Sequence, residues 1–432
     1  MKKLKVIILF IVIILLGVGG YLLYSSNYKD SNNLSTQKED IKLSNSRYAI
    51  YIENEEGNYE LSGSNAFPTE GYVFNKEESY CKNGTYLEWD EINNSLLLNT
   101  STKDKCFIYF SIVVEQTFAD YIIELAATNS HIYYHNGTIT STSVDIDNNN
   151  TILDAEDLSY RYSGSAEEVT DNYVCFGYDI DNYNNECTAI NFATSNYSYK
   201  IIGAIPVLTF NETKNAYEEQ YLVKIIKYGV YEYSKWVPNS GDTFNWNNTS
   251  LNYEVLNSKS KSTSENLESG FLYEVRENGW DNYIAIPTWY VGNYSWENVG
   301  NTSPKNAYNE EIKSSNALLT ISHNKIGLIY DHDYGFAASP RNWQTKLVDY
   351  NTVIENNWLF SYATSVGYDR WIITGSANVI EKNNGRINGY GDRYYGYSQP
   401  TFYLSSNVLI DTDNMSDTTY GTTSNPYRLK LD

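Results

Sequence analysis

The sequence VIILFIVIILLGVGGYLLY, residues 6–24, decides how the rest of the chain must be arranged. It contains no charged side chain, and as a helix it is long enough to cross a hydrocarbon core of about 30 Å. Three lysines precede it within the first five residues, and the next cation is Lys29. Because positive charge marks the cytoplasmic end of a membrane helix, we expect everything after Tyr24 to lie outside. This predicts a single-pass cell-membrane protein with a C-terminal extracellular part.

A cleavable signal peptide is the competing interpretation of this stretch. Such a peptide has an apolar region of about 7–15 residues followed by a small-residue cleavage site. Residues 18–20, Val-Gly-Gly, could supply that site, but the apolar run continues to Tyr24. The length favours an uncleaved signal-anchor at residues 1–24, and cleavage stays open.

Composition limits the partners of the remaining chain. Residues 25–46 are polar and mixed in charge, which is typical of a flexible linker. The formal net charge of −22 repels phosphate backbones, so we do not expect a nucleic-acid partner. The 43 tyrosines suit recognition surfaces, although AT-rich codons also enrich Tyr, Asn, Ile and Lys.

Residues 47–116 contain short apolar runs broken by turn residues, the pattern of strands. Five strands in about 70 residues fit a small immunoglobulin-like β-sandwich, with Asn83-Gly84 as one turn and Trp89 in the core. The expected strands are RYAIYIE (47–53), GYVF (71–74), TYLEW (85–89), SLLL (95–98) and CFIYFSIVV (106–114).

The four cysteines are expected to form structural disulfides on the outer side of the membrane. Four cysteines allow three pairings, and proximity in the sequence favours Cys81–Cys106 and Cys175–Cys187. Their acidic surroundings lack the cations that would activate a thiol.

Residues 117–160 are expected to connect two domains through a helix and an acidic turn. Residues 117–128 have helical periodicity, and Thr117 with Asp120 forms a capping box. His131 and His135 follow in a strand-like segment. Because strand spacing would separate the two rings by about 13 Å, we interpret them as unrelated surface histidines.

The acidic turn contains the most specific local motif, DIDNNNTILDAE, residues 145–156. Its oxygen donors have the spacing of a calcium loop, whose hard cation prefers oxygen ligands. Asn150 replaces the usual glycine of the turn, and no helix precedes the loop. A solvated acidic turn is therefore the favoured interpretation, with bound Ca²⁺ as the alternative. The candidate ligands are Asp145, Asp147, Asn149, Thr151 and Glu156.

From Leu158 onward several segments occur in a characteristic order. They are LSYRYSGSAEEVTDNYVCFG (158–177), YKIIGAIPV (199–207), YLVKIIKYGVYEYSKW (221–236), KIGLIYDHDYGFA (325–337), NNWLF (356–360), RWIITG (370–375) and a closing segment, YGYSQPTFYLSSNVLI…GTTSNPYRL (395–429). As an ordered set they resemble an uncharacterised family of membrane-anchored surface proteins from low-GC Gram-positive bacteria. The N-terminal cysteine-bearing region resembles the small domain that often precedes this module.

The resemblance implies that residues 161–432 form a mixed α/β module similar to the C-type-lectin and formylglycine-generating-enzyme fold. It implies no activity. This chain departs from the family where Tyr199-Lys200 replaces Trp-Arg and where Gln399 replaces an arginine before proline. The expected fold class is thus β-rich α+β: a membrane helix, a sandwich and this larger module.

Two further segments of the module are candidates for function. Asp331-His332-Asp333 is interpreted as a polar loop rather than a metal site. The glycine- and tyrosine-rich segment GRINGYGDRYYGY (385–397) suits sugar stacking or protein recognition, against the simpler interpretation of a loop that covers the core. Its candidate ligand-binding residues are Arg386, Tyr390, Arg393, Tyr394 and Tyr395.

The sequence therefore predicts a non-enzymatic surface protein of the adhesin type that binds a glycan or a protein. We assign no catalytic residue and no cofactor beyond the calcium alternative. A cell-wall or glycan hydrolase that uses paired carboxylates is the second hypothesis. A structural envelope or appendage component is the third.

Overall fold

The computed structural model describes two compact units, which divide between Val114 and Glu115. The predicted anchor at 6–24 and linker at 25–46 lie outside the described residues. In the part of the chain that is described, no helix is long and apolar enough to cross a membrane. The described residues are 48–54, 56–68, 71–90, 93–99, 104–112, 116–135, 151–152, 157–178, 187, 196–211, 214–237, 246–257, 270–291, 299–315, 320–360, 369–373, 378–383, 385–389, 395–411 and 420–431.

The first unit consists of strands, and each of the five predicted strands is present. A four-stranded sheet has the order β2-β1-β6-β3, in which β1 and β6 run parallel, and β4 and β5 form a separate hairpin. The sequence patterns did not predict the short strand β2. The strands are β1 (Tyr48–Glu53), β2 (Tyr59–Leu61), β3 (Tyr72–Cys81), β4 (Tyr86–Asp90), β5 (Ser95–Asn99) and β6 (Cys106–Ile112).

One hydrophobic cluster joins the sheet and the hairpin of this unit. Trp89 of β4 stacks on Phe74 of β3 with 5.6 Å between ring centroids and meets Phe110 of β6 edge-on at 5.1 Å. The predicted disulfide Cys81–Cys106 links β3 to β6 within the same cluster. Trp89 is therefore a packing residue, as the sequence predicted.

The second unit is built around an eight-stranded sheet and a five-stranded sheet. The larger sheet has the order β16-β21-β12-β11-β9-β7-β8 with β10 also on β11, and the smaller sheet has the order β13-β20-β17-β18-β19. Two-stranded pairs β14–β15 and β22–β23 complete it. The strands are β7 (Ile132–His135), β8 (Thr151–Ile152), β9 (Tyr160–Tyr162), β10 (Tyr173–Cys175), β11 (Ser198–Asn211), β12 (Ala216–Lys227), β13 (Tyr233–Lys235), β14 (Trp289–Tyr290), β15 (Ile321–Ser322), β16 (Ile326–Gly327), β17 (Arg370–Ile372), β18 (Asn378–Ile380), β19 (Ile387–Gly389), β20 (Tyr395–Tyr397), β21 (Thr401–Tyr403), β22 (Leu409–Ile410) and β23 (Leu429–Lys430).

Short helices pack around these sheets. The α-helices are α2 (Phe118–Leu125), α4 (Phe271–Glu277), α6 (Pro304–Tyr308) and α7 (Asp331–Phe336). The 3₁₀ and π turns are η3 (Trp246–Asn248), η4 (Leu251–Leu256), η5 (Trp280–Tyr283), η6 (Asn309–Lys313), η8 (Pro340–Asn342), η9 (Leu347–Thr352) and η10 (Ile354–Asn356).

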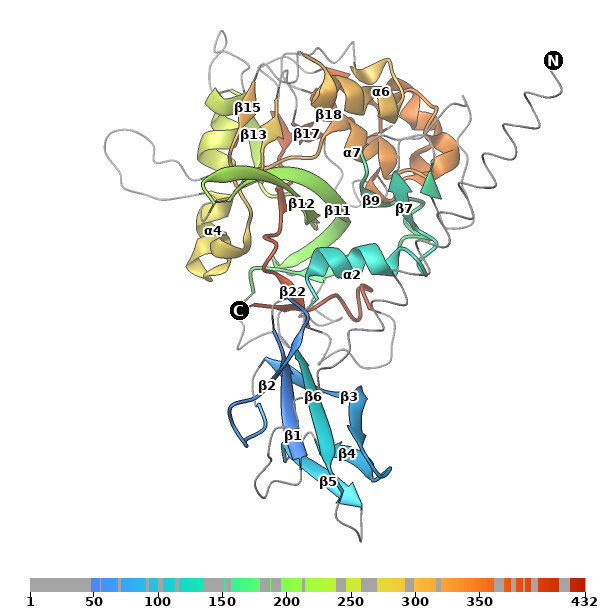
Figure 1. Cartoon of the computed structure of the whole chain (residues 1–432). Coiled ribbons are helices and arrows are strands. Elements are labelled where there is room, and N and C mark those ends of the chain that lie inside the picture. The colour runs from blue at the N-terminus through green and yellow to red at the C-terminus, as the bar shows by residue number, and fades with distance from the viewer. Residues whose placement is uncertain are drawn as a thin grey trace, which may run out of the picture. The chain divides into compact units, whose positions relative to one another are not determined.

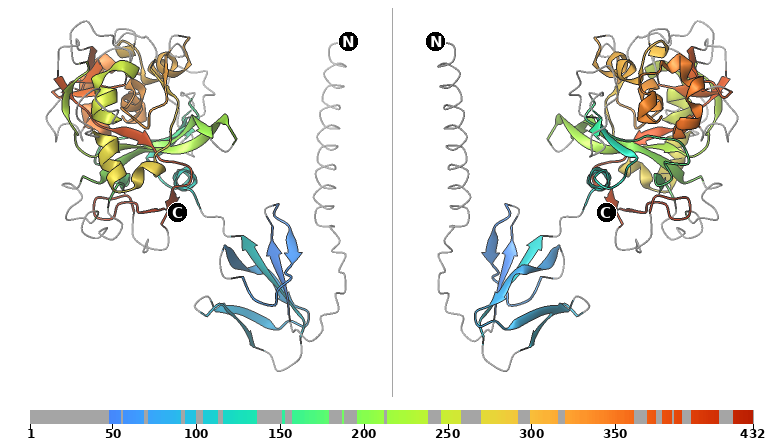
Figure 2. Two further views of the ribbon diagram at one scale, coloured as in Figure 1. Left: turned by 90° about the vertical axis from the view of Figure 1, so that its left-hand side faces the viewer. Right: turned by 90° about the vertical axis from the view of Figure 1, so that its right-hand side faces the viewer.

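The long hairpin β11–β12 is the centre of the second unit, with α2 on one side and α6 and α7 on the other (Figures 1 and 2). A register shift between Ile201 and Gly203 bends β11 where β9 pairs with it. A Cβ atom at Gly203 would lie 2.0 Å from the Tyr160 carbonyl oxygen, so only glycine allows this close approach. The bend brings β9, and with it Arg161, against the hairpin.

Helix α2 confirms the predicted start at Thr117 and the apolar face, although only the N-cap half of the capping box is present. The Thr117 side chain accepts the backbone N–H of Asp120, and Phe118 and Ile122 are buried. The helix contacts β11, β12 and β22, so its core contacts lie in the second unit. The predicted disulfide Cys175–Cys187 is also formed there.

Candidate functional site

A cluster of buried charged side chains lies where the eight-stranded sheet meets helix α7. Arg161 of β9 donates to Asp333 at 2.6 Å and to Asp157 at 2.7 Å. Lys224 of β12 places its Nζ atom 2.6 Å from the second carboxylate oxygen of Asp333. All four side chains are buried. Two carboxylates therefore neutralise two cations, which is what buried charges require.

The first turn of α7 fixes the position of Asp333. The backbone N–H of Tyr330, just before the helix, donates to Asp333 Oδ2 at 2.9 Å. A carboxylate in the first turn is also stabilised by the positive end of the helix dipole. Burial alone raises the pKa of Asp333, but Lys224, His332 and Arg161 outweigh it and hold the pKa well below its usual value.

Three aromatic rings surround the ammonium group of Lys224. Its Nζ atom lies 5.2, 4.8 and 5.1 Å from the ring centroids of Trp289, Tyr330 and Tyr403. Burial lowers the pKa of Lys224, whereas Asp333 raises it, and the electron-rich ring faces favour the charged amine. Tyr330 and Tyr403 also line the cavity described below.

A second buried group adjoins this cluster. Glu311 accepts the backbone N–H groups of Asp331 at 2.9 Å and of His332 at 3.0 Å, and its Oε2 lies 2.6 Å from His332 Nδ1. Burial and the neighbouring Asp331 raise the pKa of Glu311 well above its usual value. Burial lowers the pKa of His332 to about 3, which leaves the ring neutral at physiological pH.

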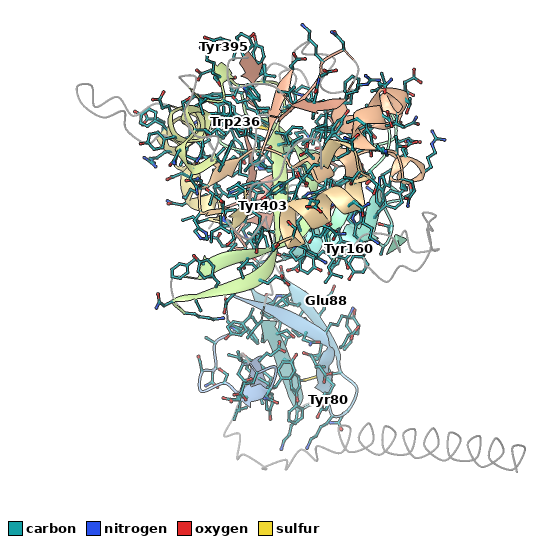
Figure 3. The ribbon with its side chains drawn as sticks, turned by 90° about the horizontal axis from the view of Figure 1, so that it is seen from above. Tyr80, Glu88, Tyr160, Trp236, Tyr395 and Tyr403 are labelled. Carbon is teal, nitrogen blue, oxygen red and sulfur yellow. A yellow bond between two sulfur atoms is a disulfide. The ribbon has the colours of Figure 1, made fainter. Side chains whose placement is uncertain are left out.

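A cavity of about 300 Å³ borders both groups. Its lining includes residues 205–208 of β11, which are aliphatic, and four tyrosines. Asp157, Arg161 and His332 reach it from the buried clusters, and Tyr403 lies in the interior of the unit (Figure 3). The tyrosines are Tyr290, Tyr308, Tyr330 and Tyr403.

Two ionisable groups of this cavity, Asp157 and His332, are poorly suited to proton transfer. Burial opposes ionisation of Asp157, but Arg161 and His135 lower its pKa well below the usual value, so it is a poor general acid. With a pKa of about 3, His332 is a weak base near neutral pH. Glu311, whose pKa is raised, does not line the cavity. A glycosidase needs a carboxyl of raised pKa and an ionised carboxyl facing one substrate, and Asp157 with Glu311 does not form such a pair across this cavity.

The outer edge of the five-stranded sheet presents a second candidate site, which we name the tyrosine edge: Tyr233 and Lys235 of β13 with Tyr395 and Tyr397 of β20. Strand register places Tyr233 opposite Tyr397 and Lys235 opposite Tyr395, so all four lie on one face. Tyr233 is 54% exposed and Tyr395 is 46% exposed.

The rings of the tyrosine edge pack against one another. Tyr233 stacks on Tyr395 with centroids 5.1 Å apart and lies 4.7 Å from Tyr397. The Nζ atom of Lys235 lies 5.2 Å from the centre of the Tyr395 ring. On the opposite face, Gly396 lies against Trp371 of the core. Figure 3 shows Tyr395 at the periphery of the unit and Trp236 further inside.

The structure places two of the five predicted ligand-binding residues. Tyr395 belongs to the tyrosine edge, whereas Arg386 precedes β19 at the other edge of the same sheet. Two strands, β17 and β18, lie between β20 and β19, a separation of about 14 Å. The structure therefore does not bring these two residues together. Tyr390, Arg393 and Tyr394 lie outside the described residues.

The calcium prediction stays a prediction. Asp145, Asp147, Asn149 and Glu156 lie outside the described residues, and Thr151 is described as the first residue of β8. Among the described residues, no group of three His, Cys, Asp or Glu side chains is arranged to hold a metal ion.

Two interpretations of histidines were wrong. His135 is fully buried rather than on the surface, because β7 lies within the eight-stranded sheet and its ring packs on Phe336 and Trp343. Asp331-His332-Asp333 forms the buried first turn of α7 rather than a polar loop. The charges that compensate this turn come from strands that are distant in the sequence, so the neighbouring residues do not reveal them.

The buried residues that sequence reasoning missed are Arg161, Lys224 and Glu311. One signal could have indicated Lys224: it interrupts the apolar run of β12, YLVKIIK, where a charge needs a buried partner. Asp333 similarly lies between apolar segments. Nothing in the sequence pairs the two, since 109 residues separate them.

Comparison with known proteins adds no relative. No family model, no curated protein and no solved structure matches this chain.

Proposed function

We propose that the protein is a membrane-anchored, extracellular glycan-binding protein without catalytic activity, and that the tyrosine edge contacts the glycan. The observation that carries the proposal is the stacked pair Tyr233 and Tyr395, both about half exposed. Adjacent exposed rings form a rigid apolar surface, and phenol hydroxyls at its margin donate and accept hydrogen bonds. A sugar ring offers a C–H face and surrounding hydroxyls, which match both features.

Charge favours a neutral or weakly acidic glycan over a polyanion. The chain has a formal net charge of −22, which repels highly charged polymers at long range. Within the tyrosine edge, Lys235 supplies one local cation beside the Tyr395 ring. A single acidic group on the glycan could pair with it.

The placement of the chain at the membrane and the detailed fold of each unit belong to the same proposal. Residues 6–24 would anchor the chain, with the described units outside the cell, where the two disulfides are expected to persist. The first unit would be an immunoglobulin-like sandwich. The second would be a C-type-lectin-like module, for which the central hairpin with helices on both sides is suggestive support.

A glycan array probed with the full-length chain, in a detergent without a sugar headgroup, tests the proposal. We expect retention of at least one glycan class, weakened at least tenfold by Tyr395→Ala and by Tyr233→Ala. Tyr86→Ala is the matched control, because Tyr86 is 58% exposed but lies in the first unit.

Three outcomes would count against the proposal in different ways. Binding that resists both tyrosine replacements would remove the tyrosine edge from it. Consumption of the glycan would favour the hydrolase hypothesis. If the chain binds host proteins but no glycan, its ligand is a protein instead. A parallel array in chelator decides whether the calcium loop takes part.

A further inference from the structure

The cavity beside the buried charge cluster contains hydroxyl groups without protein partners. Thr288 lines it, but Thr288 Oγ1 lies beneath the surface of the cavity, where an occupant does not reach it. The hydroxyl groups within reach of an occupant are those of tyrosines in the lining.

Two tyrosine hydroxyls lack a protein partner and, unlike Thr288 Oγ1, are not among the buried unpartnered atoms. Within the described part of the chain, neither Tyr308 nor Tyr403 has a hydrogen bond from its hydroxyl group, and both rings line the same cavity. By contrast, the hydroxyl of Tyr330 accepts the backbone N–H of Tyr290 at 2.9 Å. Two tyrosines with unpartnered hydroxyls, Tyr403 of β21 and Tyr308 of α6, therefore line one space.

The charges of the lining cancel. It contains two acids, Asp157 and Glu219, and two bases, Arg161 and Lys313, so its net charge is zero when His332 is neutral. Asp157 and Arg161 already form an ion pair with each other. An ionic ligand would therefore find no unbalanced counter-charge, whereas an uncharged ligand would meet no penalty.

The size of the cavity and the chemistry of its walls further restrict which ligands fit. A cavity of about 300 Å³ is at the small end of known ligand pockets, which span roughly 300–1,000 Å³. The aliphatic residues 205–208 and the tyrosine rings provide apolar walls, and the hydroxyls of Tyr308 and Tyr403 provide neutral donors and acceptors. Such a lining matches one small molecule that is rich in hydroxyl groups yet has C–H faces.

We propose that this cavity is a binding site for a single uncharged sugar ring, separate from the tyrosine edge. It does not depend on the proposed function of that edge, and it requires no chemistry on the sugar. The ring would lie against the aliphatic wall and exchange hydrogen bonds with Tyr308 and Tyr403.

Saturation-transfer difference NMR with free monosaccharides tests the inference on the full-length chain. The probes are glucose, galactose, mannose and N-acetylglucosamine, with glucuronic acid and glucosamine as charged comparators. We expect saturable binding of at least one neutral sugar and weaker binding of its charged counterpart. Tyr308→Phe and Tyr403→Phe each remove one hydroxyl while keeping the ring, and each should weaken binding about 2- to 12-fold.

Tyr395→Ala serves as the control and should leave monosaccharide affinity unchanged while it reduces glycan retention on the array. The proposal for the tyrosine edge and the proposal for the cavity can therefore be refuted independently of each other. The inference is overturned if no neutral monosaccharide saturates, if both hydroxyl deletions leave the affinity unchanged, or if the charged comparators bind more tightly. If one variant fails to fold, as thermal unfolding will show, the other decides.

Discussion

The Nζ atom of Lys224 lies 2.6 Å from Asp333 Oδ2, with both side chains fully inaccessible to solvent. This contact joins the central hairpin to helix α7. Asp333 is also bound by Arg161 at 2.6 Å, so one carboxylate compensates two buried cations. Removing the shared anion should therefore cost more than removing either cation.

We predict that Asp333→Asn destabilises the second unit by about 3–5 kcal/mol, because it leaves Lys224 and Arg161 partly unpaired in the interior. Lys224→Met should cost less, since Arg161 still neutralises Asp333. Urea unfolding followed by tryptophan fluorescence measures this, because every tryptophan except Trp89 lies in the second unit.

Lys214→Met is the control for this series. It breaks an ion pair with Glu218 in which the lysine side chain is 64% exposed, so the expected loss is at most about 1 kcal/mol. Equal losses for Asp333→Asn and Lys214→Met would contradict the importance given to the buried pair.

Lys200 predicts a pH dependence of stability. Burial lowers its pKa to about 7, although Asp171 and the rings of Tyr173 and Trp358, at 4.4 and 4.8 Å, favour the charged amine. In the unfolded chain a lysine pKa is about 10.4. Between about pH 7 and 10 the unfolded state therefore binds more protons, so the free energy of unfolding rises with pH.

Lys200→Met should flatten that rise, by up to about 1.4 kcal/mol per pH unit. The measurement is the urea midpoint at several pH values from 6 to 10, compared with the unchanged chain. Lys227, whose pKa burial lowers to about 8, contributes a similar term that remains in the variant. If the two pH profiles are parallel, Lys200 does not titrate as stated.

Sequence patterns predicted much of the local structure, because it depends on neighbouring residues. The five strands of the first unit follow from apolar runs between turn residues, and Thr117 with Asp120 marked the start of α2. Both disulfides joined the nearest cysteines. These features involve separations of at most 25 residues.

The candidate sites could be predicted only in part, because they depend on long-range contacts. Tyr395 was singled out from its segment, but its partner Tyr233 comes from a strand more than 150 residues earlier and reaches it only through sheet pairing. The cavity draws its lining from β11, α6, α7 and β21. His135 looked like a surface group because the rings on which it packs, Phe336 and Trp343, are remote in sequence.

Gly396 supports the tyrosine edge from behind, and Gly396→Ala tests this. An added Cβ atom would lie 2.8 Å from the Trp371 ring, so β20 or the indole must move. We expect a destabilisation of about 1–3 kcal/mol and weaker glycan retention, although both exposed tyrosines remain. Gly63→Ala is the control, because a Cβ atom there meets nothing within 4 Å. Unchanged glycan retention in a destabilised Gly396→Ala variant would separate binding from the position of β20.

The disulfide Cys81–Cys106 should stabilise the first unit alone. It closes a loop across 25 residues, and the chain-entropy model assigns such a loop about 3 kcal/mol. Replacing both cysteines by alanine should therefore speed hydrogen exchange in β3 and β6 by roughly a hundredfold, since 1.4 kcal/mol corresponds to a factor of ten.

Exchange in β11 and β12 of the second unit should not change in that variant, because the two units have separate cores. Replacing Cys175 and Cys187 should show the reverse pattern. Hydrogen exchange should become faster near β10 and β11 and stay unchanged in β3 and β6. The shorter span of 12 residues gives this bond a smaller entropic effect, by about 0.6 kcal/mol. Faster exchange in both units after either replacement would mean that they unfold together rather than independently.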